Sequence, residues 1–372
     1  MDFGLSETQE MLRSSAREFL VARESVTLAR KSHSDPDAHE ALWREVSALG
    51  WPGLVVDEQY GGTGLGFDDL CILLEECAAA LAPGPLFEAT VLGASMLGRS
   101  VAVGLKTALL HQVATGNAIV TLAHLEGSGR WEDECTTAAE PQGSGRWRIS
   151  GEKRFVPAGA IATHLVVSAA SESGDVMLFV VPRDTHGIEI RPMRVASGEA
   201  YASIELHGVS ADEESLLCHP NDAGQVLSET LSLAATARSA QMGGAASAVV
   251  RRTTEYVSSR KQFGRPIGSF QAIQHRLADM ATAVRGSRHL ARSAAWHLTS
   301  GEPAARAVAR AKSHAGEHLP VVCWDAHQLH GAIGFTWEHD LHLYTRRVVS
   351  WRAEYGDSRH WRRVLANLLL ET

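Results

Sequence analysis

Cysteine is scarce in this 372-residue sequence, and its arrangement excludes several kinds of cross-linked or zinc-bearing protein. Only five cysteines are present, an odd number, and no two of them form a Cys-x-x-Cys pair. The spacing therefore predicts neither a zinc ribbon nor a redox-active dithiol. We expect reduced thiols in a cytoplasmic protein.

Long apolar runs and an excess of positive charge are also missing. No stretch of about 18 uninterrupted apolar residues occurs, so no transmembrane helix is expected. Residues 1–6 lack a basic segment followed by an apolar run, so no secretory signal is expected. Lys and Arg number 35 against 43 Asp and Glu, a formal net charge of -8. That balance argues against nucleic acid or an anionic membrane as partner.

The hydrophobic pattern of the first part of the chain, residues 1–118, predicts an α-helical domain. Ser6 followed by Gln9 has the form of a capping box, which satisfies free N–H groups at a helix start. Apolar residues recur at helical spacing in two later segments, each closed by a helix-terminating signal. These segments contain Leu42, Val46 and Leu49 before Gly50, and Leu70, Leu73, Leu74, Cys77, Ala78 and Leu81 before Pro83.

A glycine-rich segment, Gly61–Gly66, lies between those two helical stretches. Glycine-rich loops cradle phosphates when they follow a strand and open a helix. This segment does not follow a strand, so we interpret it as a tight surface loop.

The rest of the chain changes from strand-like to helix-like patterns. Residues 119–219 contain five short β-rich runs separated by turn residues, which predicts a β-barrel or sandwich. The runs begin at Arg146, His164, Val176, Gly187 and Ala202. Residues 220–372 carry long helical patterns, which span roughly 222–260, 269–300, 303–330 and 338–368 and are joined by short links. This arrangement is typical of a four-helix bundle. The predicted fold class is therefore α+β and multidomain: an α-helical domain, a middle β domain and a C-terminal helical bundle.

Two motifs in the last part are the most informative. The run Arg260-Lys-Gln-Phe-Gly-Arg-Pro-Ile-Gly268 is followed by Gln271-Ala-Ile-Gln-His-Arg-Leu-Ala-Asp-Met280. A second run begins Gln328-Leu-His-Gly-Ala-Ile-Gly-Phe-Thr-Trp and ends at Tyr344. In sequence, order and separation these runs resemble two signatures of the acyl-CoA dehydrogenase family. Trp51–Gly62 also resembles a familiar segment of that family's N-terminal domain, which supports a structural role for the glycine-rich loop.

The resemblance implies an FAD cofactor and an oligomer with shared sites. In the family, the two signatures hold the ADP half of a flavin whose ring lies mainly in a neighbouring subunit. The diphosphate needs cationic or N–H donors, and Arg offers a planar fork suited to it. Ala332 departs from the pattern, because the family usually has a second glycine there. The resemblance assigns cofactor binding to Arg260, Gln262, Phe263, Gln328, Leu329 and Gly331.

The segments that would contact the flavin ring match the family less well. The family usually shows a Thr-Glu-Pro-x-x-Gly-Ser-Asp segment, which only Glu126, Gly127 and Ser128 echo here. A Trp-x-Thr segment corresponds to Lys153–Pro157, which has no hydroxyl residue. Pro157 has no backbone N–H to donate. These departures put a complete ring pocket in doubt.

The catalytic base is also in question. The family removes the α proton of an acyl-CoA with a Glu at one of two positions. Ungapped alignment places these positions on Tyr355 and Ala234, neither of which is a base at neutral pH. Glu354 is the one carboxylate close enough to stand in, although on a helix one residue is about 100° of rotation. Glu229 lies five residues before Ala234 and is a weaker candidate.

These features leave three functional hypotheses open. The chain is an acyl-CoA dehydrogenase that uses Glu354 or another base, or it is a base-less subunit that completes the FAD site of a homologous catalytic chain. The latter is similar to one subunit of heteromeric, steroid-type acyl-CoA dehydrogenases. The third hypothesis is a non-redox binding protein with the family fold. For the first two, the resemblance implies an acyl-CoA substrate and an electron-transfer flavoprotein as acceptor.

Histidine pairs at helical spacing offer a possible metal site, but no recognised ligand set accompanies them. His327 and His330 are three residues apart, as are His339 and His342, and such spacing can ligate a metal. Both pairs lie inside the second family signature, so we expect packing or flavin contact and no metal.

Overall fold

The computed structural model describes residues 4–32 and 39–370, and its contacts divide the chain into two compact units. The first comprises Met1–Asp35, Phe67–Pro83 and Ala235–Thr372. The second comprises Pro36–Gly66 and Gly84–Ala234. The boundary falls within the longest helix, α7 (Ala223–Ser259).

In the first unit, three helices come from the N-terminal part of the chain: α1 (Glu7–Ala22), α2 (Ser25–Lys31) and α4 (Phe67–Ala79). The predicted capping box is confirmed, because the side chains of Ser6 and Gln9 bond each other's backbone N–H. The apolar stripe on α4 is buried as predicted, and Leu81 is buried just beyond the helix end.

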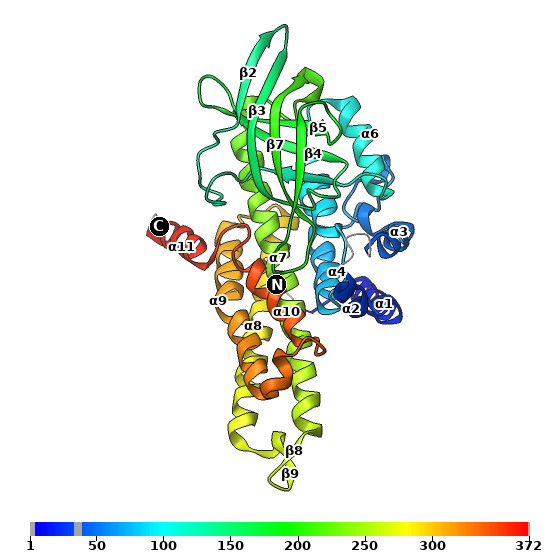
Figure 1. Cartoon of the computed structure of the whole chain (residues 1–372), viewed down its shortest axis with the longest axis vertical. Coiled ribbons are helices and arrows are strands. Elements are labelled where there is room, and N and C mark those ends of the chain that lie inside the picture. The colour runs from blue at the N-terminus through cyan, green and yellow to red at the C-terminus, as the bar shows by residue number, and fades with distance from the viewer. Residues whose placement is uncertain (1–3, 33–38, 371–372) are drawn as a thin grey trace. The chain divides into compact units, whose positions relative to one another are not determined.

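The C-terminal part supplies the other helices of this unit (Figure 1). They are α7, α8 (Gln271–Ser300), α9 (Ala305–His330), α10 (Leu341–Trp351) and α11 (Ser358–Leu370). The prediction of one helix over about 338–368 is wrong, because the chain turns between α10 and α11. Tyr355 and Gly356 have φ angles of 53° and 85° there, and two successive left-handed residues cannot continue a right-handed helix.

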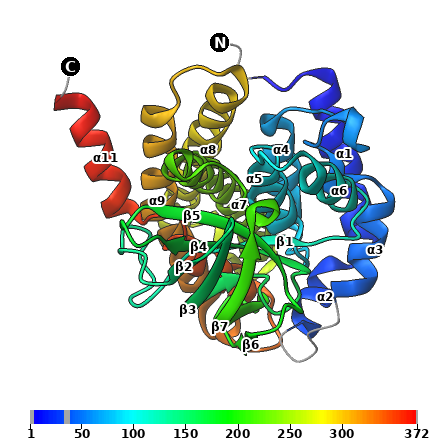
Figure 2. The same ribbon diagram turned by 90° about the horizontal axis from the view of Figure 1, so that it is seen from above.

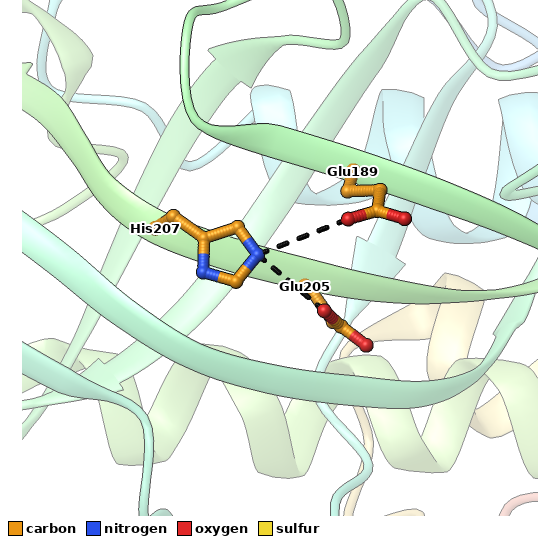
Figure 3. A group of neighbouring side chains, drawn as sticks. All are labelled: Glu189, Glu205 and His207. Atoms are coloured by element: carbon orange, nitrogen blue, oxygen red, sulfur yellow. Dashed lines mark ion pairs between the residues drawn. The ribbon is translucent and has the colours of Figure 1, made fainter.

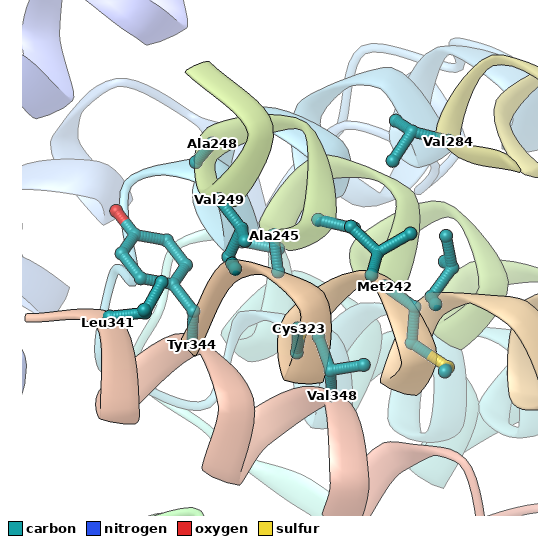
Figure 4. Packing of buried hydrophobic residues seen from close by; sticks show 14 of the residues in the cluster. Met242, Ala245, Ala248, Val249, Val284, Cys323, Leu341, Tyr344 and Val348 are labelled. Carbon is teal, nitrogen blue, oxygen red and sulfur yellow. The ribbon is translucent and has the colours of Figure 1, made fainter. Parts of the chain in front are cut away.

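The core of this unit lies between α7, α8, α9 and α10. Figure 4 shows Met242 and Val249 of α7 facing Cys323 of α9 and Val348 of α10. Helix α4 approaches α7 very closely, because a Cβ added at Gly244 would overlap the carbonyl oxygen of Glu75. Only glycine permits that contact.

The helical part of the second unit is built from short elements. They are η2 (Trp51–Gly53), η3 (Glu58–Tyr60), the π-helix η4 (Glu88–Ala94), α3 (Glu40–Ala48), α5 (Ser95–Leu97) and α6 (Val103–Ala114). Leu49 was expected on the buried face of α3, but it caps the helix and its side chain is 54% exposed. The glycine-rich segment is a tight loop as predicted, since a Cβ at Gly62 would overlap the carbonyl oxygen of Val56.

The β part of this unit is one seven-stranded sheet, visible from above in Figure 2. Its strands run in the order β1-β4-β2-β3-β7-β6, with β5 paired to β4. Strands β1 and β4 are parallel, whereas β3 pairs antiparallel with β7. The strands are β1 (Val120–Ala123), β2 (Ala138–Gly143), β3 (Arg146–Pro157), β4 (His164–Ala170), β5 (Val176–Pro182), β6 (Ile188–Met193) and β7 (Tyr201–Asp212).

The predicted fold class is confirmed: helices, then a β-rich middle part, then long helices. All five strand-like runs are strands. Strands β1 and β2 were not expected from the sequence, and they are only four and six residues long. Among the described residues, no helix is both long and apolar enough to cross a membrane.

Candidate active site

The first family signature forms the end of α7 and the hairpin that follows it. Strands β8 (Lys261–Gln262) and β9 (Arg265–Pro266) pair through a two-residue turn at Phe263 and Gly264. Both turn residues are left-handed, with φ angles of 53° and 78°, as a tight hairpin turn requires. The ring of Phe263 is 91% exposed as a result.

The second signature lies at the end of α9, in the same unit. Gln328 and Leu329 belong to its last turn, and Gly331 follows with φ 67° and ψ -147°, a conformation suited to glycine. The ring of Tyr256 on α7 stacks on His330 with centroids 4.4 Å apart, and its hydroxyl donates to the His330 carbonyl at 3.3 Å. The structure therefore joins the helices that carry the two signatures.

These residues fit the diphosphate of a bound FAD. Arg260, Gln262 and Gln328 are exposed, and no described residue pairs with the Arg260 guanidinium. No heavy atom lies within 4 Å of a Cβ built at Gly331, so its backbone is open to close approach. Ala332, the departure from the family pattern, is also exposed and lies in the short turn η8 (Gly331–Phe335).

Two segments were expected to contact the flavin ring, one containing Glu126 and the other containing Lys153. They contact each other in the second unit. The Glu126 carboxylate, 5% exposed, forms an ion pair with the ammonium of Lys153, which is fully buried. Lys153 Nζ also lies 3.0 Å from Ser168 Oγ. Glu126 thus points inward, whereas Gly127 and Ser128 are exposed. The ion pair between Lys153 and Glu126 was not expected from the sequence.

Glu126 links the two ends of the loop between β1 and β2 through hydrogen bonds. Its carboxylate accepts from the backbone N–H of Thr136 at 2.7 Å and of Thr137 at 3.1 Å, and from the Thr136 hydroxyl. Burial alone would raise the pKa of Glu126, but hydrogen bonds from Lys153 and Thr136 hold it at about 2. The carboxylate is therefore ionised at every physiological pH.

The candidate base Glu354 lies in the turn between α10 and α11. The comparison with the family's base positions had treated this segment as helical. Its Oε2 is 2.9 Å from Nε of Arg238, whose side chain is only 1% exposed. A carboxylate paired with a guanidinium is held in its charged form and is a poorer proton acceptor than a free one. The two aligned base positions carry no carboxylate, and Ala234 is fully buried.

Two further groups surround this ion pair. The Arg238 guanidinium lies over the ring of Trp351, 5.2 Å from its centroid. Lys312 is fully buried, and its Nζ donates to the carbonyls of Trp351 and Arg352, both at 3.0 Å. Burial lowers the pKa of Lys312 to about 7, and Glu354 opposes that shift. These cations hold the end of α10, where unpaired carbonyls favour positive charge.

The histidine pairs of the second signature are engaged in packing. His327 Nε2 lies 2.8 Å from Thr345 Oγ1, and its ring stacks on Phe335. His330 Nδ1 bonds the Ala326 carbonyl at 2.8 Å. Burial lowers the pKa of His327 and of His330.

Elsewhere in the described residues, Glu189, Glu205 and His207 have the spacing of metal ligands (Figure 3). His207 Nε2 lies 3.4 Å from Glu205 and 4.0 Å from Glu189. Arg191 also pairs with both carboxylates, at 2.9 Å to Glu189 and 2.6 Å to Glu205. Because Arg191 pairs with both carboxylates and offsets part of their charge, the group is explained as an exposed ion-pair network.

Structural comparison relates the chain to solved assemblies over its whole length. A chain of the ChsE4-ChsE5 complex from Mycobacterium tuberculosis superposes with a TM-score of 0.91 at 26% identity, covering 100% of both chains. A chain of the Tcur3481-Tcur3483 steroid ACAD superposes with a TM-score of 0.86 at 30% identity, covering 98% of both.

Sequence comparison gives the same relationship. Models of the acyl-CoA dehydrogenase N-terminal, middle and C-terminal domains match residues 6–117, 127–209 and 223–370. The acyl-CoA dehydrogenase IpdE2 of Mycolicibacterium smegmatis is 30% identical over 348 residues, covering 90% of this chain and 93% of that protein. The chain therefore belongs to the acyl-CoA dehydrogenase family of FAD-dependent oxidoreductases.

Proposed function

We propose that this chain is a subunit of an acyl-CoA dehydrogenase assembly, in which it completes the FAD site of a homologous catalytic chain and supplies no base. One observation carries the proposal: Glu354, the one carboxylate beside an aligned base position, is ion-paired with the buried Arg238. Proton abstraction from carbon needs a carboxylate aimed at the substrate and free to accept the proton.

The reaction of the assembly is the α,β-dehydrogenation of a CoA thioester. The base of the catalytic chain would take the α proton, and FAD, when bound, would supply the acceptor for the hydride from the β carbon. In this chain Arg260 would donate its guanidinium fork to the diphosphate, and the open backbone at Gly331 would allow close approach. The electrons then pass to an electron-transfer flavoprotein.

The surface around the second signature supports association with another subunit. Several large apolar side chains are exposed there, although side chains of this type are usually buried. Such a surface is typical of an interface. The residues and their exposed fractions are Trp324 52%, Ile333 47%, Phe335 65% and Trp337 52%.

The solved relatives favour a heteromeric assembly. Two of them are two-component complexes, one of which is called a steroid acyl-CoA dehydrogenase. We propose a bulky, steroid-derived acyl-CoA as the substrate class of the assembly. We place the assembly in the cytoplasm, where the five free cysteines would stay reduced.

Co-expression tests the proposal directly. The chain is purified alone and together with a homologous chain encoded beside it, and the flavin absorbance per protein is measured for each preparation. We expect little flavin with the single chain and stoichiometric flavin with the pair. Stoichiometric FAD on the single chain, together with oxidation of an acyl-CoA, would refute the proposal.

The second candidate function is a self-sufficient dehydrogenase that uses Glu354. One observation favours it: Glu354 lies in a turn next to the aligned position Tyr355, so no helical rotation directs its side chain away. This function requires the Arg238 pair to break when substrate binds. It predicts that Glu354→Gln abolishes turnover.

A further inference from the structure

A partly buried cluster of reactive side chains in the second unit has no part in the function proposed above. Lys153 Nζ lies 3.7 Å from the sulfur of Cys135 and 3.0 Å from Ser168 Oγ. The Cys135 thiol donates to Glu126 Oε1 at 3.5 Å. A thiol, an amine and a carboxylate therefore meet within hydrogen-bond or van der Waals distance of one another.

Cys135 differs from the other four cysteines in both exposure and neighbours. Cys71, Cys77, Cys218 and Cys323 are buried, whereas Cys135 is only partly covered. Cys135 is therefore more accessible to a small oxidant than the four buried cysteines, whereas Lys153 has no exposed surface. Oxidation of cysteine depends on this combination of access and local charge.

We propose that Cys135 and Lys153 are a peroxide-driven modification site, at which an oxygen atom becomes covalently bound between Sγ and Nζ. First, the Cys135 sulfur attacks hydrogen peroxide. An S–O bond forms, the O–O bond breaks, and one water leaves as the thiol becomes a sulfenic acid. A second peroxide then oxidises the sulfenic acid and the Lys153 ammonium together, which forms the O–N bond and releases two waters and a proton.

The neighbouring groups suit both steps. Glu126 accepts the hydrogen bond of the thiol and so keeps the sulfur in place, while the thiol proton passes to the departing hydroxide, which leaves as water. The Lys153 ammonium favours the anionic sulfur and holds the amine beside it. Burial raises the pKa of Cys135, and the charge of Lys153 opposes that rise. The first step is therefore slower than at a fully activated thiolate.

The covalent bridge between Cys135 Sγ and Lys153 Nζ would destabilise the β1–β2 loop. Lys153 loses its charge on oxidation, so the Glu126 carboxylate remains buried without its cation. Uncompensated buried charge is strongly unfavourable, and Glu126 also holds the backbone of Thr136 and Thr137. The oxidised protein should therefore loosen around this loop, and reduction by a thiol should restore it.

Peptide mass spectrometry of the intact folded protein tests the site. The chain is treated with hydrogen peroxide, remaining thiols are alkylated after denaturation, and the protein is digested with trypsin. We expect peptide 131–146 linked to peptide 149–154, with a net gain of about 14 Da from one oxygen added and two hydrogens lost. Lys153 should resist cleavage in that product, and dithiothreitol should release both peptides.

Two variants provide the controls. Cys135→Ser should abolish the linked product, whereas Cys218→Ser, which removes a buried thiol of the same unit, should keep it. Lys153→Arg keeps the cation without a primary amine and should yield only an oxidised thiol. The proposal is overturned if wild-type Cys135 gains about 16 or 32 Da with Lys153 still cleavable, or if it does not react.

Discussion

Replacing Glu354 by glutamine separates the two roles that this carboxylate can have. If Glu354 is the counter-ion of Arg238, the substitution leaves a buried guanidinium without its charge partner. If Glu354 is the base, the same substitution removes the proton acceptor of the reaction. Both roles predict a loss of stability, because the ion pair is present in the resting protein. The first role predicts that activity is retained, whereas the second predicts that it is lost.

The expected loss of stability follows from the burial of the pair. Breaking a fully buried ion pair by removing one partner costs about 3–5 kcal/mol. Glu354 is 18% exposed while Arg238 is 1% exposed, and glutamine still offers an oxygen to the guanidinium. We therefore expect a smaller loss, about 1–3 kcal/mol of unfolding free energy.

The assay combines urea unfolding with turnover of the assembled enzyme. Glu317→Gln is the matched control, because Glu317 pairs with Arg362 on the surface and both are about half exposed. That change should alter the unfolding free energy by less than about 0.5 kcal/mol. We expect Glu354→Gln to lower the urea midpoint and to leave kcat within about twofold. A folded assembly whose kcat falls about 100-fold or more would show that Glu354 is the base.

Three further predictions follow from close packing, titration and cofactor binding. Gly244→Ala should cost at least about 2 kcal/mol of unfolding free energy, because the added methyl group would overlap the Glu75 carbonyl oxygen. Gly224→Ala is the control: a Cβ at Gly224 meets nothing within 4 Å, so this change should be neutral or stabilising in the same urea titration. Burial lowers the pKa of Lys312 from 10.5 to about 7. Between pH 7 and 10.5 Lys312 is therefore protonated in the unfolded chain but largely neutral in the folded one, so the free energy of unfolding rises with pH. The difference in unfolding free energy between wild type and Lys312→Met should rise across that pH window by at most about 1.4 kcal/mol per pH unit. A difference that does not change with pH would show that the pKa of Lys312 is not lowered. Arg260→Ala should lower the flavin content of the assembly without moving the urea midpoint of the chain, and unchanged flavin content would exclude the diphosphate role.

The regular elements were predictable because their signals are local. The capping box at Ser6, the apolar stripe on α4 and the strand-like runs each depend on residues a few positions apart. The break between α10 and α11 was missed although Gly356 marks it, because apolar residues continue at helical spacing on both sides. Strands β1 and β2 are too short to show a clear period.

The candidate site was predictable only in part. Both family signatures are local runs, and the structure brings their helices together through Tyr256 and His330. The ion pairs were not predictable, because each joins residues far apart in the sequence. Lys153 pairs with Glu126 across 27 positions, and Arg238 pairs with Glu354 between two different helical segments. Charged side chains usually lie in solvent, so nothing in the sequence marks these as buried.

The most direct test of the proposed role is an anaerobic titration of the single chain. The chain is mixed with FAD, and acyl-CoA thioesters of several chain types are added while the absorbance of the flavin in the mixture is followed. Our account predicts that the flavin stays oxidised until the homologous catalytic chain is added. Bleaching of the flavin by the single chain would contradict it, because a proton acceptor for the substrate would then have to lie within this chain.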